Sequence, residues 1–187
     1  MERSLAVVLA CVTLLSVYTE ARMTPVKAAA FQAVPELPYR VVRKYGTGIG
    51  EFNLPHTVAV DKQGRVYVGD RENQRIQIFD SEGNFIQQWT GIGYPYGLLI
   101  TPDQHVWMVD GGYDRIVELD QNGKILGAFG EPGHKPGQMA WAHFMAMGPD
   151  QTLYVANVLN WRFDVFARTA PTGGMTKYIP SVRMFWG

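Results

Sequence analysis

Residues 54–90 read LPHTVAVDKQGRVYVGDRENQRIQIFDSEGNFIQQWT, and this stretch recurs in recognisable form twice more along the 187-residue chain. The second copy, YPYGLLITPDQHVWMVDGGYDRIVELDQNGKILGAFG, begins at Tyr94, and the third, WAHFMAMGPDQTLYVANVLNWRFDVF, begins at Trp141. His56, Tyr96 and His143 occupy the same position of the three copies, 40 and then 47 residues apart. A repeat of about 40 to 50 residues that holds several short strands predicts the blades of a β-propeller.

Within each copy the apolar residues alternate as they do in half-buried strands. In the first copy Val58 and Val60 are two positions apart, as are Ile76 and Ile78, which places each pair on one face of a sheet. The segments DKQG at 61–64 and DSEG at 80–83 separate these runs, and their glycines suit tight hairpin turns. We therefore expect an all-β chain with four antiparallel strands per copy.

The repeat predicts three complete four-stranded blades, at about 53–90, 94–130 and 139–187, and an extra N-terminal strand around residues 40–45. Closed propellers have about 4 to 8 blades. Three blades leave alternatives: two chains share a ring, the chain is a partial copy of a longer propeller, or an open arc exposes its blade faces. Because exposed apolar faces of that size promote association, we favour a homodimer that completes the propeller.

The N-terminus has the features of an export signal. An apolar run at residues 5–18 follows Arg3, and it is shorter than the ~20 residues of a spanning helix. We predict a signal peptide at 1–21, a linker at 22–37, the propeller at 38–187, and an exported (secreted or periplasmic) protein. The alternative is an uncleaved membrane anchor, and no other membrane contact is expected.

Composition narrows the classes of partner. The chain has 17 basic and 17 acidic residues, a balance that argues against an electrostatic search for nucleic acid. Its only cysteine, Cys11, lies inside the expected signal, so the mature chain would carry no disulfide and no thiol nucleophile.

Several motifs resemble those of a known repeat family. GTGIGEF at 46–52, VYVGD at 66–70 and NQRI at 73–76 resemble the NHL repeat. FNLPHTVAVD followed by GDRENQRIQIF is most similar to the peptidyl-α-hydroxyglycine α-amidating lyase family. That resemblance implies cleavage of a peptidyl-α-hydroxyglycine into a peptide amide and glyoxylate, with zinc in the central channel and calcium as a further cofactor. The alternative is a non-catalytic propeller that binds a peptide or protein partner.

The resemblance assigns His56 and His143 as zinc ligands. Equivalent inner-strand positions of a propeller converge on its axis, so their imidazoles can meet there. Tyr96 stands at the third such position, where a catalytic zinc site would usually have another ligand. The competing interpretation is that both histidines line the channel and bind no metal.

Two further residues are assigned catalytic roles by the same resemblance, Arg71 and Tyr113. Arg71 also breaks the repeat, since Gly111 and Val158 fill its position in the other copies. A guanidinium there could grip the carboxylate of a peptide substrate in bidentate fashion. The alternative is an exposed loop arginine paired with Glu72.

Some polar residues recur in every copy instead. Arg75, Arg115 and Arg162 are equivalent, and an aspartate or asparagine stands five positions before each of them. A role that is needed once is not encoded three times. We therefore expect these pairs to pin strands together and assign them no catalysis.

Overall fold

The computed structural model describes residues 37–44 and 51–168, and the described part of the chain is built from β-strands with one short 3₁₀ turn. The all-β prediction is confirmed. The first sheet contains β1 (Pro55–Val60), β2 (Val66–Asp70), β3 (Arg75–Phe79) and β4 (Phe85–Thr90). The second contains β5 (Pro95–Ile100), β6 (Val106–Asp110), β7 (Arg115–Leu119) and β8 (Ile125–Phe129), and the third contains β9 (Ala142–Met147), β10 (Leu153–Asn157) and β11 (Arg162–Phe166).

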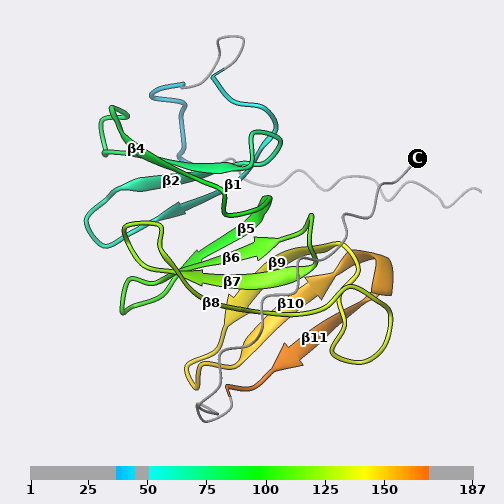
Figure 1. The fold of residues 1–187 in the computed structure, drawn as a ribbon. Coiled ribbons are helices and arrows are strands. Elements are labelled where there is room, and N and C mark those ends of the chain that lie inside the picture. The colour runs from blue at the N-terminus through cyan, green and yellow to red at the C-terminus, as the bar shows by residue number, and fades with distance from the viewer. Residues whose placement is uncertain (1–36, 45–50, 169–187) are drawn as a thin grey trace, which may run out of the picture. The chain divides into compact units, whose positions relative to one another are not determined.

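Each sheet is an antiparallel meander in which neighbours in sequence are neighbours in space. The orders are β1-β2-β3-β4, β5-β6-β7-β8 and β9-β10-β11. Figure 1 shows the three sheets one after another, and contacts join β1 to β5 and β5 to β9. The first strands of the three sheets are therefore the ones that meet at the inner side, as in the blades of a propeller.

One strand of the predicted count lies outside the described residues, and another does not form. The third sheet has three described strands, and the fourth, expected near Met184–Gly187, lies outside the described residues. No strand forms at residues 40–44, where an extra N-terminal strand was expected. A strand needs a hydrogen-bonded neighbour, and this segment is exposed throughout. Tyr45, the expected signal peptide and the linker up to residue 36 also lie outside the described residues.

Residues 37–42 belong to a different compact unit from the sheets, which lie in the unit 43–187. The part of the chain that the structure describes contains no helix long and apolar enough to cross a bilayer.

The core consists of two clusters, one in each space between neighbouring sheets. Between the first two sheets, Tyr67, Ile76 and Ile78 pack against a group from the second sheet. That group includes Val106, Met108, Val117 and Leu119. Between the second and third sheets, Ile116, Trp107 and Phe129 pack against Met147, Leu153, Val155 and Phe166. The second sheet thus presents one face to the first sheet and the other face to the third.

Repeated polar pairs fix the inner corner of each sheet. Asp70 accepts a hydrogen bond from Asn53 N at 2.7 Å and from Arg75 Nε at 2.7 Å. Asp110 does the same with Tyr94 N at 2.9 Å and Arg115 Nε at 2.8 Å. Both aspartates are fully buried, and each joins the end of one strand to the segment that leads into the first strand. This confirms the structural role expected for the recurring residues.

Candidate functional site

His56, Tyr96 and His143 meet at the inner side of the stacked sheets, although 87 residues separate the two histidines. They lie near the starts of β1, β5 and β9. The imidazole centroids are 5.4 Å apart, and the Tyr96 ring is 4.9 Å from His56 and 5.0 Å from His143. We call these three residues the axial cluster. The structure therefore brings together the two residues predicted as metal ligands, and it does so through equivalent positions of different sheets.

Backbone carbonyls orient both imidazoles. His56 Nδ1 lies 2.6 Å from Tyr96 O, and His143 Nδ1 lies 2.9 Å from Trp141 O. A carbonyl oxygen only accepts hydrogen bonds, so Nδ1 must carry the proton in each ring. The neutral ring then presents the lone pair of Nε2, which is the arrangement found in metal-binding and general-base histidines.

Burial favours the neutral form of His143. Desolvation of its ring is the main cause of a lowered pKa, and the nearby His56 and Arg71 lower it further. The hydrogen bond to the Trp141 carbonyl works in the opposite direction. A neutral imidazole with its Nε2 lone pair available can accept a proton near neutral pH.

Trp141 forms one wall of the cluster. Its ring lies 4.6 Å from that of His143 at 87°, and its Nε1 donates a hydrogen bond to Tyr96 Oη at 3.3 Å. The repeat alone does not assign Trp141 a role, and its contact with the axial histidine comes from the structure. Its left-handed backbone (φ 57°) two residues before His143 is a constraint that a residue pattern does not reveal. Trp161, in the same copy, is 92% exposed.

Arg71 extends over the cluster from the turn between β2 and β3. Its guanidinium carbon lies 4.9 Å from the centroid of the Tyr96 ring, and its side chain is 18% exposed. The Nε donates to Glu72 at 2.9 Å, so the pairing considered as an alternative is present too. Among the described residues its Nη groups have no hydrogen-bond partner, and the guanidinium lies beside the axial cluster. Both interpretations of this arginine therefore apply at once.

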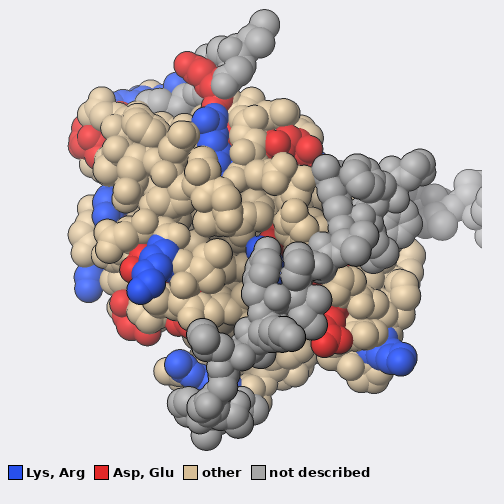
Figure 2. Space-filling view, in the orientation of Figure 1, with Lys and Arg blue, Asp and Glu red and all other residues tan. Residues whose placement is uncertain are grey.

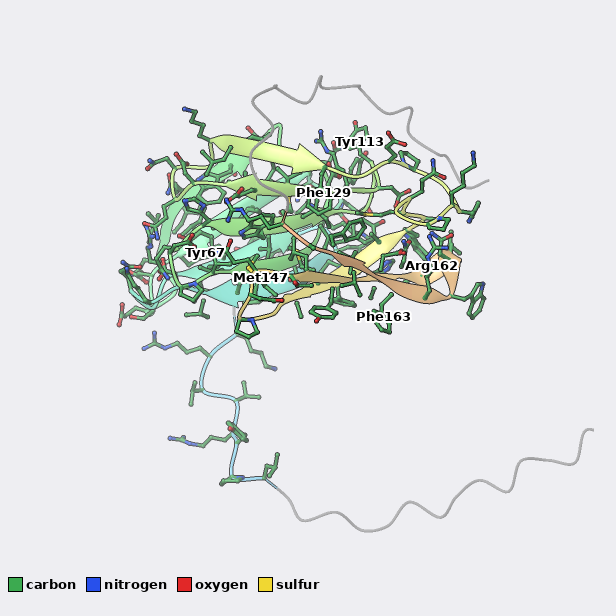
Figure 3. All side chains as sticks on the ribbon, turned by 90° about the horizontal axis from the view of Figure 1, so that it is seen from below. Tyr67, Tyr113, Phe129, Met147, Arg162 and Phe163 are labelled. Carbon is green, nitrogen blue, oxygen red and sulfur yellow. The ribbon has the colours of Figure 1, made fainter. Side chains whose placement is uncertain are left out.

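Tyr113 belongs to a different group of rings. It lies in the turn between β6 and β7, where its ring is 5.9 Å from that of Tyr94 and 5.3 Å from the Arg115 guanidinium carbon. Figure 3 shows Tyr113 and Arg162 at one end of the strands, with Tyr67 and Met147 toward the other. Of the four residues assigned by resemblance, His56 and His143 belong to the axial cluster and Arg71 lies beside it. Tyr113 lies in another turn.

Two glycines permit the close approach of the inner strands. A Cβ at Gly97 would lie 2.6 Å from His143 O. A Cβ at Gly111 would lie 2.6 Å from the Tyr96 ring and 2.7 Å from Ala142 O. Gly111 is the equivalent of Arg71, so the crowding explains why the second sheet has no side chain at that position. The difference between the first copy, which has Arg71, and the second, which has Gly111, is a consequence of packing at the axis.

The residues of the cluster supply part of a zinc site. Two imidazoles with available Nε2 atoms are suitable ligands, whereas catalytic zinc usually has three protein ligands. The described residues contain no group of three His, Cys, Asp or Glu side chains that could hold a metal ion. The Tyr96 hydroxyl already accepts the Trp141 hydrogen bond. Within one chain the described ligand set is therefore incomplete for catalytic zinc. Calcium, implied by the resemblance alone, has no assigned ligands.

Three grooves lie away from these residues. One of about 330 Å³ opens between the second and third sheets, lined by Trp107, Phe129, Met147, Leu153, Phe166 and Arg168, among others. It contains none of the residues predicted for the site. On the face shown in Figure 2, basic and acidic side chains are interspersed without a large area of one sign.

Comparisons with known proteins agree with this architecture. Residues 52–79 match the family model of the NHL repeat. The chain is 44% identical over 62 residues to NHL repeat-containing protein 3 of Homo sapiens, covering 31% of this chain and 18% of that protein. It is 35% identical over 131 residues to peptidyl-glycine alpha-amidating monooxygenase A of Xenopus laevis, covering 61% of this chain and 14% of that protein. The chain thus spans less than a fifth of the length of these relatives.

Among solved structures, the hydrazine synthase of Kuenenia stuttgartiensis superimposes with a TM-score of 0.51 at 17% identity. The alignment covers 66% of this chain and 36% of that one. The stacked sheets, of four, four and three described strands, and the axial convergence of their first strands define a partial β-propeller. More narrowly, residues 52–79 match the NHL repeat, and 131 residues are similar to peptidyl-glycine alpha-amidating monooxygenases A and B.

Proposed function

We propose that the axial cluster binds the C-terminal carboxylate of a peptidyl-α-hydroxyglycine and that the chain cleaves it as a C–N lyase. The observation that carries the proposal is the placement of two Nδ1-anchored imidazoles within 5.4 Å of each other. The Arg71 guanidinium, whose carbon lies 4.9 Å from the centroid of the Tyr96 ring, supplies a positive charge for the carboxylate. Similarity to peptidyl-glycine alpha-amidating monooxygenases supports this choice of substrate class.

The proposed reaction needs only a proton shuttle and an anion site. His143 Nε2 accepts the proton of the carbinol O–H, and the O–H electron pair forms the carbonyl of glyoxylate. The C–N bond breaks with its electrons retained by nitrogen, which then takes the proton back from the imidazole to give the peptide amide. Atoms and charge balance without an oxidant. Arg71 holds the carboxylate through its Nη groups and so fixes the carbinol relative to His143.

A second function, binding without chemistry, is favoured by the aromatic wall of the cluster. The Tyr96, Trp141 and Phe144 rings surround the histidines, and the Phe144 ring stacks against His56 at 5.9 Å. Such a wall with one guanidinium fits the C-terminal residue of a peptide ligand.

The discriminating assay measures glyoxylate release from N-benzoyl-α-hydroxyglycine by the full chain. We expect release from the wild type and a fall in kcat of about 100-fold or more in His143→Gln, which removes the proton acceptor. We expect Arg71→Lys to raise KM more than it lowers kcat, because lysine keeps the positive charge but lacks the planar guanidinium that binds a carboxylate through two N–H groups. The zinc and calcium contents of the purified wild type and His56→Ala proteins test the two metals separately.

N-benzoylglycine, which lacks the carbinol, serves as the control ligand. Calorimetric binding of this compound, lost in Arg71→Ala, together with no glyoxylate release, would replace the lyase by the binding function. If neither release nor binding is seen, both proposals fail.

A further inference from the structure

In the described residues the third sheet leaves one apolar face uncovered, and the first sheet leaves part of one. On that face of the first sheet Val58 and Val60 are 62% and 58% exposed, whereas Val68 is 9% exposed. We call the face of a sheet that packs on the next sheet its forward face, and the opposite one its rear face. In the first sheet the forward face includes Ile76, which is 0% exposed against the second sheet. Its equivalent in the third sheet is Phe163, which is 66% exposed (Figure 3).

The forward face of the third sheet repeats a surface that is buried elsewhere in the same chain. Tyr154, Phe163 and Val165 stand at the positions of Tyr67, Ile76 and Ile78 in the repeat. The three residues of the first sheet are fully buried, whereas those of the third are all exposed. None of the three exposed residues is charged.

The rear face of the first sheet repeats the other half of that interface. Val58 and Phe79 are the equivalents of Leu98 and Leu119, which pack in the cluster between the first two sheets. Val58 is 62% exposed. A groove of about 340 Å³ lies on this face, and it is lined by Phe52, Pro55, Val58, Val66, Val68 and Phe79, among others.

From these two faces we propose that a second copy of this chain is the partner. The forward face of the third sheet in one copy packs on the rear face of the first sheet in the other, in the way that the first sheet packs on the second. Such contacts are head-to-tail and close only if the rotation permits. Two copies give six described sheets, within the ~4 to ~8 blades of closed propellers.

Closure by two copies would complete the axial cluster. The two-fold axis would bring His56 and His143 of the partner subunit to the same channel as the first pair. A site with two imidazoles in one chain would then contain four. The proposal does not depend on the lyase activity, because the interface is argued from sheet faces alone.

The first measurement is the mass of the full chain in solution, by light scattering during gel filtration. We expect twice the chain mass of 21.0 kDa. A compact monomer would overturn the proposal, and open polymers would overturn the two-chain ring. Val58→Asp and Phe163→Asp should each give monomers with an unchanged circular dichroism spectrum.

A mixing experiment tests the head-to-tail pairing independently. Each variant keeps one intact face, so an equimolar mixture of Val58→Asp and Phe163→Asp should form dimers through one good interface. A mixture that stays monomeric would refute the pairing. Leu126→Asp is the matched control, since this residue is 46% exposed on β8, outside both faces. It should leave the dimer intact.

Discussion

Asn157 donates a hydrogen bond from Nδ2 to Asp164 Oδ2 at 2.7 Å. Together these two residues make the contacts in the third sheet that Asp70 makes alone in the first sheet and Asp110 in the second. Asn157 Oδ1 accepts from Ala140 N at 2.7 Å, as Asp70 does from Asn53 N. Arg162 Nε donates to Asp164 at 2.9 Å instead of to residue 157. The carboxylate has moved seven residues along the repeat, while the arginine has kept its position.

This relationship predicts that the carboxylate can be moved in the first sheet too. Asp70→Asn removes the charged partner of Arg75 and should lower the free energy of unfolding by about 2–3 kcal/mol, since the buried charge pair is broken. Adding Gln77→Asp, at the position equivalent to Asp164, should restore at least half of that loss. Urea unfolding of the single and double variants measures both values. No recovery in the double variant would show that the two arrangements are not interchangeable.

The lowered pKa of His143 predicts a dependence of stability on pH. Burial keeps its folded pKa below the ordinary 6.5, so below that pH the unfolded chain takes up the proton first. The contribution of the buried neutral imidazole to the free energy of unfolding is therefore complete above about pH 6.5. It is lost as the pH falls through this value toward the folded pKa. His143→Gln should flatten the stability curve just below pH 6.5. Thermal melts across this range make the test, and an equally steep curve in the variant would exclude His143 as the cause.

The raised pKa of Tyr67 predicts that stability also depends on pH in the alkaline range. Desolvation raises the pKa of this buried phenol from 10.0 to about 12, with the Asp61 carboxylate contributing. Above pH 10 the unfolded chain releases its proton before the folded chain does, so stability falls as the pH rises from about 10 to 12. Tyr67→Phe loses the 3.2 Å hydrogen bond to Asp61, which costs about 1 kcal/mol at neutral pH, but it should remove the alkaline slope. Tyr39→Phe, at a residue that is 85% exposed and outside the sheets, is the control.

Gly111 predicts that the geometry of the axial cluster depends on a missing side chain. Gly111→Ala places a Cβ against the Tyr96 ring and Ala142 O, and overpacking of this kind costs about 1–3 kcal/mol. The shift of Tyr96 should also disturb the neighbouring histidines, which would be visible as altered imidazole resonances by NMR. Gly127→Ala, where an added Cβ meets nothing within 4 Å, is the matched control. Equal effects of both substitutions would contradict this explanation.

Much of the fold follows from the sequence because a repeat samples one environment three times. Residues such as Val58 and Ile76 show the same alternation as their equivalents, so the strands and their order could be predicted. The convergence of His56 and His143 followed from their equivalent positions. The absence of a strand at residues 40–44 could not be foreseen, since pairing depends on a neighbour and not on the segment itself.

The missed features depend on three-dimensional surroundings that no periodicity encodes. Trp141 joins the cluster because its backbone adopts a left-handed conformation. Tyr113 packs with Tyr94 because the turn between β6 and β7 directs it there. The exchange between Asn157 and Asp164 could have been found by aligning the three copies, since the asparagine in one copy is matched by an aspartate seven positions later.

The anchoring of His56 by the carbonyl of Tyr96 has a consequence for how this propeller can diversify. Because a main-chain atom fixes the imidazole, the side chain at position 96 can be exchanged without releasing its neighbour. Tyr96→His would retain the anchor and place a third imidazole among the inner strands. The scaffold therefore separates the atom that orients His56 from the side chain at position 96, so that a single substitution can change the chemistry of the inner strands without releasing the imidazole.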